Sequence, residues 1–194
     1  MNADIGLYRQ KYALRAVLVR VPGVDRLSPN ALSLAAFVPG ALAALCVYEG
    51  CWLWAIAAIV ARMIVSTLDG LVAEEFGKAT RLGAYLNRVP GEVNDILIAG
   101  ALWPHAEASH VVTLVALTGL VQMFGTLGVV GGGRVQSVGP CGQTDRLVIV
   151  GAGCALAAVG LPQWSLLVHA LLLGCIVTIV LRVYRTVSEL QGPA

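Results

Sequence analysis

Six long apolar segments constrain the fold of this chain more than any other feature of the sequence. They are residues 31–48, 51–68, 82–103, 111–131, 147–162 and 164–184. A helix needs about 20 mostly apolar residues to cross a membrane, and most of these segments are close to that length. The sequence therefore predicts an all-α polytopic membrane protein, a six-transmembrane-helix bundle.

The composition agrees with lipid as the main solvent of the chain. Hydrophobic residues make up 58% of the sequence and charged residues only 12%, whereas soluble domains carry about 25% charged residues. The five cysteines are scattered without the close spacing of metal or redox sites, so we interpret them as small apolar side chains. We expect membrane lipid around the chain and no nucleic-acid partner.

The first 30 residues differ from the rest because basic residues alternate with apolar ones. Within 5–27 the spacing is helical, which predicts an amphipathic helix lying at the cytoplasmic membrane surface. An ordinary juxtamembrane leader would have the same composition. Ser28-Pro29-Asn30 then predicts the cap and start of the first span. We accordingly divide the chain into 1–30, a membrane domain 31–185 and a cytoplasmic tail 186–194.

Lysine and arginine are distributed on one side of the predicted spans. All 13 lie in, or next to, the segments 1–30, 69–81, 132–146 and 185–194. The alternate turns, 49–51, 104–110 and 161–163, contain none. Because positive residues favour the cytoplasmic side, we expect both termini to be cytoplasmic.

Polar residues concentrate at the end of the second span and in the third. Gly83, Asn87, Gly91 and Asp95 recur at every fourth position, which places them on one helix face. Asp69 stands near the end of the preceding span. Ionisable groups inside spanning helices are costly and usually functional. We therefore predict a cytoplasm-facing cavity that contains Asp69, Asn87 and Asp95.

The stretch 66–91 resembles the signature of the CDP-alcohol phosphatidyltransferases, Asp-x-x-Asp-Gly-x-x-Ala-Arg-x8-Gly-x3-Asp-x3-Asp. Four positions match the signature, namely Asp69, Gly70, Ala73 and Gly83. Four positions depart from it: Ser66, Asn87 and Gly91 replace the first, third and fourth Asp, and Glu74 replaces the Arg. The spacing of the signature is thus intact, while its chemistry is altered.

Two further segments extend the resemblance over nearly the whole chain. Ser28-Pro29-Asn30 is similar to a Pro-Asn element before the first span of the family. Residues 139–146, Gly-Pro-Cys-Gly-Gln-Thr-Asp-Arg, resemble a Gly-Pro-x-Gly-Lys-x-Asp-Arg loop of a bacterial branch. That branch also tends to carry an additional Asp corresponding to Asp95. The resemblance implies six spans with both termini inside, in a bacterial inner membrane, and allows a homodimer.

The resemblance implies transfer of a phosphatidyl or phosphoalcohol group from a CDP-linked lipid or CDP-alcohol to a hydroxyl acceptor. CMP is released, and the reaction belongs to phospholipid synthesis. In the family, four Asp side chains hold two divalent cations, Mg²⁺ or Mn²⁺, and here the set is weakened. The implied metal ligands are Asp69, Asn87, Ser66 and Asp95, and Asp69 and Asp95 are the implied catalytic residues. Implied substrate-binding residues are Gly70, Ala73, Gly83, Arg134 and Arg146.

Other interpretations of these residues remain open at this stage. Asn87 and Asp95 can instead pair across helices, since polar side chains join spanning helices. Arg134 and Arg146 are equally explained by positive-inside topology. The missing carboxylates favour a catalytically impaired member that acts as a partner or scaffold for lipid enzymes. A small transporter is disfavoured, because transporter sites lie near the membrane midplane.

Overall fold

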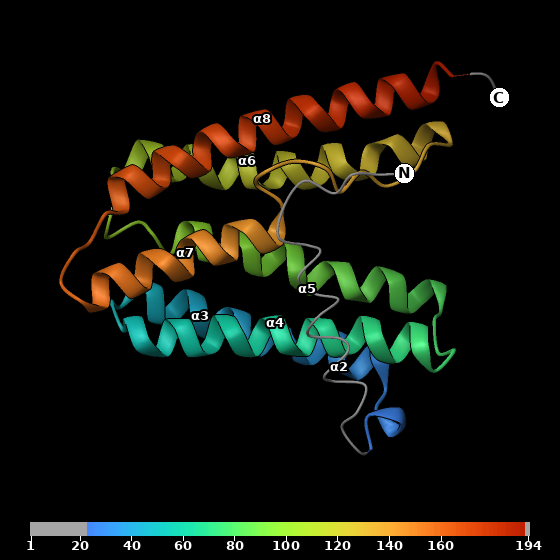
Figure 1. The fold of residues 1–194 in the computed structure, drawn as a ribbon, viewed down its shortest axis with the longest axis horizontal. Coiled ribbons are helices and arrows are strands. Elements are labelled where there is room, and N and C mark those ends of the chain that lie inside the picture. The colour runs from blue at the N-terminus through green and yellow to red at the C-terminus, as the bar shows by residue number, and fades with distance from the viewer. Residues whose placement is uncertain (1–22, 193–194) are drawn as a thin grey trace.

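The computed structural model describes residues 23–192, and their regular structure is helical throughout. Figure 1 shows the long helices lying side by side along one direction, with α6 and α8 on one side, α5 and α7 in the middle, and α3 and α4 on the other. The helices are α2 (Pro29–Ala35), α3 (Phe37–Tyr48), α4 (Trp52–Glu75), α5 (Arg81–Gly100), α6 (Ala108–Thr126), α7 (Gln143–Ala158) and α8 (Trp164–Leu190), with short 3₁₀ helices η2 (Val24–Arg26) and η3 (Leu127–Gly131).

Four helical segments in the described part of the chain are long and apolar enough to cross a membrane. They are Pro29–Tyr48, Trp52–Glu75, Ala108–Gly131 and Trp164–Leu190. Large apolar side chains such as Trp54 and Leu173 are exposed on these helices, and an apolar surface of this kind requires lipid or another protein to cover it. The chain is therefore a membrane protein. α5 carries several polar residues and α7 has only 16 residues, so neither is both long and apolar enough to count as a span by itself.

The first span is divided into α2 and α3 near Ala36. Pro39 lacks a backbone N–H and its ring conflicts with a continuous helix, which explains a break at this place. Asn94 of α5 donates from Nδ2 to the Ala36 carbonyl at 3.0 Å. Gly40 makes room for this contact, because a Cβ atom there would overlap the Asn94 amide. The break thus provides a polar attachment point between the first span and α5.

The segment before α7 enters the bundle instead of staying at its end. Figure 1 shows α7 beginning near the middle of the bundle. Arg182 of α8 donates to the Val138 carbonyl at 3.1 Å, and Thr178 accepts from the Cys141 N–H at 3.0 Å. Gly139 has a φ of 126° and lies against Thr178, so a side chain there would be both strained and obstructed. These contacts determine where Gln143, the first residue of α7, is placed.

The main apolar core is built largely from small side chains. Alanines at 43, 55 and 58 are almost fully buried between α3 and α4, and small residues let spanning helices approach closely. Trp52, His105 and Trp164 pack together at the end where α4 and α8 begin, with ring centroids 4.8–5.8 Å apart. Aromatic side chains are enriched at membrane–water interfaces, which agrees with the assignment of this end to one membrane surface.

Several features predicted from the sequence can be compared with these elements. Each of the six predicted segments overlaps a described helix, but the ends differ by up to seven residues and four of the segments qualify as candidate spans. Ser28 caps α2 by accepting from the Ala31 N–H, with Pro29 at the first helical position. The predicted amphipathic helix lies almost entirely outside the described residues; within 23–27 the structure has only the 3₁₀ turn η2.

Candidate functional site

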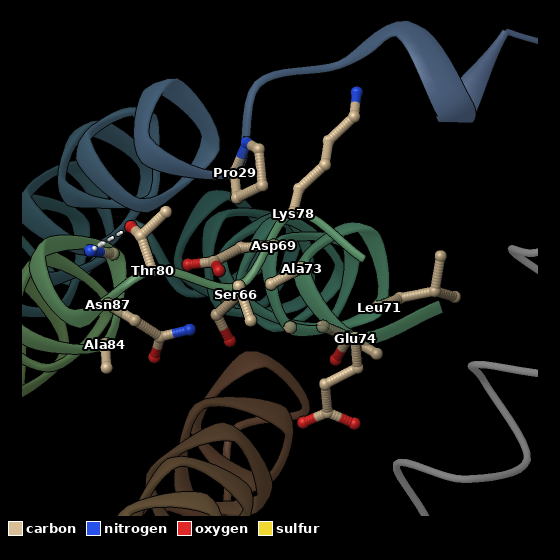
Figure 2. A pocket seen from close by; sticks show the side chains of 14 residues that line it. Pro29, Ser66, Asp69, Leu71, Ala73, Glu74, Lys78, Thr80, Ala84 and Asn87 are labelled. Atoms are coloured by element: carbon tan, nitrogen blue, oxygen red, sulfur yellow. Dashed lines mark hydrogen bonds between the residues drawn. The ribbon is translucent and has the colours of Figure 1, made fainter. Parts of the chain in front are cut away.

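A polar cavity of about 410 Å³ lies between α2, α4 and α5, at the end of the bundle that contains the α4–α5 turn. Figure 2 shows this cavity and the side chains around it. Seven of the eight signature positions line the cavity, and Gly91 is the exception. The lining residues are Pro29, Ser66, Thr67, Asp69, Gly70, Leu71, Ala73, Glu74, Lys78, Ala79, Thr80, Gly83, Ala84 and Asn87.

Asp69 is the central acidic residue of the cavity. Although it is only 3% exposed, it lines the cavity, and the Ser33 hydroxyl of α2 donates to Asp69 Oδ2 at 2.6 Å. This hydrogen bond fixes the orientation of the carboxyl group. In Figure 2 the Ser66 and Asn87 side chains lie beside Asp69, whereas the Glu74 carboxylate points away from it. Asp69, Ser66 and Asn87 therefore line the same cavity.

The start of α5 places the signature glycine and Asn87 at this cavity. The Thr80 hydroxyl caps α5 by accepting from the Gly83 N–H at 2.9 Å, which satisfies one of the unpaired donors of the first turn. A Cβ atom at Gly83 would lie 2.9 Å from Asn30 Oδ1 and 3.0 Å from Thr80 Oγ1. Gly83 thus allows α5 to pack against the beginning of α2, where the Pro-Asn element stands.

Asp95 does not line this cavity, which corrects the prediction that it faces the same space as Asp69 and Asn87. Its side chain is 1% exposed and lies between two arginines. Arg146 Nη2 is 2.5 Å from Asp95 Oδ2, and Arg62 Nη2 is 3.5 Å from Asp95 Oδ1. The physical reason is charge: this carboxylate compensates the buried guanidinium groups of Arg62 and Arg146. This geometry conflicts with the catalytic and metal-binding roles that the resemblance implied for Asp95.

The structure separates the residues that the resemblance implied for substrate binding. Gly70, Ala73 and Gly83 line the cavity with Asp69. Arg146 and Arg134 do not. Arg146 is buried and, besides Asp95, donates to the Cys141 carbonyl at 2.7 Å. Arg134 is exposed and lies 3.6 Å from Glu189 of α8.

Two residues whose importance the sequence did not reveal, Arg62 and Gln143, lie next to Gly91, where the family signature has its fourth Asp. Arg62 Nη2 donates to the Gly91 carbonyl at 3.0 Å. A Cβ atom at Gly91 would lie 2.5 Å from Gln143 Nε2. Arg62 stands one helical turn before Ser66, which is the signal that would have placed it near the site. Gln143 could not be found in this way, because α7 is remote in sequence.

The donors in the cavity suit one divalent cation better than two. Within residues 23–192, no group of three or more His, Cys, Asp or Glu side chains is placed to hold a metal ion. Ser66 and Asn87 offer neutral oxygens beside the Asp69 carboxylate. Magnesium is commonly bound by one or two carboxylates, water and substrate phosphates. One such ion fits this set when a diphosphate completes it, whereas a four-carboxylate, two-ion centre does not.

Comparison with known proteins supports the fold independently of the signature. Models of known protein families give no match to the sequence. The inner membrane protein YnbA of Escherichia coli (strain K12) is 35% identical over 105 residues. This alignment covers 53% of the present chain and 52% of YnbA, so the chain matches about half the length of this relative.

Solved structures of the Mycobacterium tuberculosis phosphatidylinositol phosphate synthase PgsA1 are similar over nearly the whole chain. The structure with manganese and citrate gives a TM-score of 0.75 at 18% identity, covering 95% of this chain and 93% of PgsA1. The fold is that of a CDP-alcohol phosphatidyltransferase. The structure with CDP-DAG bound gives 0.69 at 18% identity, covering 94% of each chain, and the apo form gives 0.71 at 20% identity, covering 94% and 100%. The resemblance suggested by residues 66–91 is thereby confirmed at the level of the fold.

Proposed function

We propose that this chain is a CDP-alcohol phosphatidyltransferase-like enzyme of phospholipid synthesis. It transfers a phosphatidyl or phosphoalcohol group from a CDP-linked donor to a hydroxyl acceptor and releases CMP. The observation that carries the proposal is the cavity in which Asp69, Gly70, Ala73 and Gly83 stand together at the signature spacing. The fold shared with PgsA1, whose structures contain CDP-DAG or manganese, supports it.

The proposed reaction is a displacement at the phosphorus that carries the lipid or alcohol. The acceptor oxygen forms a new P–O bond, the bond from phosphorus to the CMP oxygen breaks, and the acceptor proton is lost to solvent. A divalent cation, Mg²⁺ or Mn²⁺, would be held by Asp69 with oxygens of Ser66 and Asn87 and would neutralise diphosphate charge. The hydrogen bond from the Ser33 hydroxyl fixes the orientation of the Asp69 carboxyl group. Gly70 leaves open space beside the backbone, which admits a substrate.

A catalytically impaired protein that serves as a partner or scaffold for lipid enzymes is the second candidate. The specific observation in its favour is the loss of carboxylates from the signature. Asp69 is the remaining acid at the four Asp positions, since Ser66, Asn87 and Gly91 occupy the other three. Such a protein would keep the fold and the cavity but would release no CMP.

The two candidates are separated by an assay of CMP release. We expect the purified protein in detergent to release CMP from CDP-diacylglycerol when a mixture of polyol and phosphopolyol acceptors and millimolar Mg²⁺ or Mn²⁺ are present. Chelation of the cation should abolish release, because the diphosphate charge would then be unscreened. A heat-inactivated sample controls for spontaneous hydrolysis. Absence of acceptor-dependent CMP release with every alcohol and both cations would favour the scaffold.

We also propose that the chain crosses the inner membrane six times with both termini cytoplasmic. α5 is too polar and α7 too short to qualify as isolated spans. They complete the crossing pattern because α5 packs against α2, α3 and α6, and α7 packs against α4. The one-sided distribution of lysine and arginine supports the orientation. YnbA of Escherichia coli is an inner membrane protein by name, which supports the location.

Cysteine labelling tests the orientation. Ala108 and Ser188 are exposed and lie at opposite ends of the bundle, at the beginning of α6 and near the end of α8. In a Cys51→Ser background, which removes the exposed native thiol, Ala108→Cys should react with an impermeant maleimide in whole spheroplasts. Ser188→Cys should react only after the membrane is opened. The opposite pattern would reverse the proposed topology, and labelling of both in intact spheroplasts would refute the three spans proposed between these two positions.

A further inference from the structure

The surroundings of Gly91 determine how many cations the cavity accepts. We infer that the site holds a single divalent cation, at Asp69, and that the Gln143 amide and the Arg62 guanidinium occupy the region where a second would bind. This inference rests on the proposed function, because it concerns the cation that the proposed reaction uses. It differs from the family pattern, in which four Asp side chains hold two cations.

The first argument is steric. A Cβ atom at Gly91 would lie 2.5 Å from Gln143 Nε2 and 3.4 Å from Gln143 Oε1. Real Cβ atoms do not approach other atoms to 2.5 Å, so the Gln143 amide, the end of a flexible side chain, occupies the space beside position 91 and would have to move to admit another side chain. Thr178 and Arg182 hold the segment that leads into α7. Gln143 is therefore delivered to this place by the backbone, with its amide in place of the fourth carboxylate.

The second argument is electrostatic. Arg62 is 3% exposed and donates to the Gly91 carbonyl at 3.0 Å. Its partner Asp95 is shared with Arg146, so two guanidinium groups face one carboxylate in this region. Like charges repel strongly where water is excluded. A second divalent cation next to position 91 would lie close to the Arg62 guanidinium group, which repels it.

The third argument concerns the Asp69 side of the cavity, where the oxygen donors suit a cation. Asp69, Ser66 and Asn87 supply one carboxylate and two neutral oxygen donors at the cavity wall. A donor diphosphate adds further oxygens, which gives one magnesium or manganese ion a normal ligand set. The geometry thus favours one cation on the Asp69 side and an uncharged amide on the Gly91 side.

Direct counting of bound manganese tests this inference. Mn²⁺ is titrated into the purified full chain in detergent with CDP-diacylglycerol. Electron paramagnetic resonance measures the Mn²⁺ that remains free, and bound Mn²⁺ is obtained by difference. We expect one Mn²⁺ per chain for the parent and none for Asp69→Ala. Two Mn²⁺ ions per chain in the parent, both lost on Asp69→Ala, would overturn the inference. This count needs no variant that disturbs folding near Gly91.

Variants of the Gly91–Gln143 pair test whether Gln143 blocks the position of a second cation. Gly91→Asp alone should leave Mn²⁺ affinity unchanged and lower the melting temperature, because the new side chain meets the Gln143 amide. Gly91→Asp with Gln143→Ala should bind Mn²⁺ roughly tenfold more tightly than the parent, since affinity rises with the number of charged ligands. Gln143→Ala alone is the matched control and should still bind one ion. Tighter binding by Gly91→Asp alone would show that Gln143 does not fill the site.

These outcomes are distinguishable from failure of the proposed function. CMP release together with two bound Mn²⁺ ions would retain the function and refute the single-cation inference. One bound Mn²⁺ without CMP release for any acceptor would retain the inference and favour the scaffold. Neither Mn²⁺ binding nor CMP release by the folded parent would refute both.

Discussion

Replacement of Asp69 by Ala should abolish CMP release, with a loss of about 100-fold or more. A cation that neutralises phosphoryl charge contributes several kcal/mol to the transition state, and each 1.36 kcal/mol corresponds to about tenfold in rate. Ser66 and Asn87 are neutral and cannot compensate for the lost carboxylate. The measurement is the initial rate of CMP release at saturating Mg²⁺, together with Mn²⁺ binding, which should fall in parallel.

Glu107 provides the matched control for the Asp69 variant. Glu107 precedes α6, at the opposite end of the bundle from the cavity, and its side chain is 68% exposed. Glu107→Gln also removes one negative charge and should leave both CMP release and Mn²⁺ binding unchanged. If Asp69→Ala keeps more than half of the parental rate while remaining folded, the role assigned to Asp69 is wrong.

Replacement of Asp95 by Asn should destabilise the protein strongly, by about 3–5 kcal/mol, whether or not a divalent cation is present. Removing one partner of a buried ion pair leaves an unpaired buried charge, and the measured costs are of this size. Here two arginines would lose the same carboxylate. Their guanidinium groups remain charged under all ordinary conditions. Thermal unfolding in detergent, with Mg²⁺ and with chelator, is the measurement.

Two further variants serve as controls for the effect of Asp95→Asn on stability. Glu92→Gln removes a charge from the same helix and should change stability little. Asp95→Asn combined with Arg146→Met should recover part of the loss, since replacing charged partners with apolar groups is often neutral or favourable. An Asp95→Asn variant of normal stability that has lost Mn²⁺ binding would instead restore the metal-ligand role implied by the family resemblance.

The difference between Asp69 and Asp95 shows how far helical spacing can predict a site. Spacing placed Asn87 and Asp95 on the same face of α5. The face, however, extends over several turns and meets different neighbours along its length. Near Asn87 it borders the open cavity, and near Asp95 it borders Arg62 and Arg146. Sequence spacing predicts the face of a helix but not the partner on that face.

What the sequence determined by itself is the class of fold, the helix positions and the group around Asp69. Apolar segments long enough to cross a membrane must form helices there, because backbone polar groups cannot remain unpaired in lipid. Local spacing then brought Gly83 and Asn87 to the cavity. Only the tertiary structure placed Gln143 against Gly91, because the segment before α7 folds into the bundle and is held by α8. That contact depends on how distant helices pack and not on a local pattern.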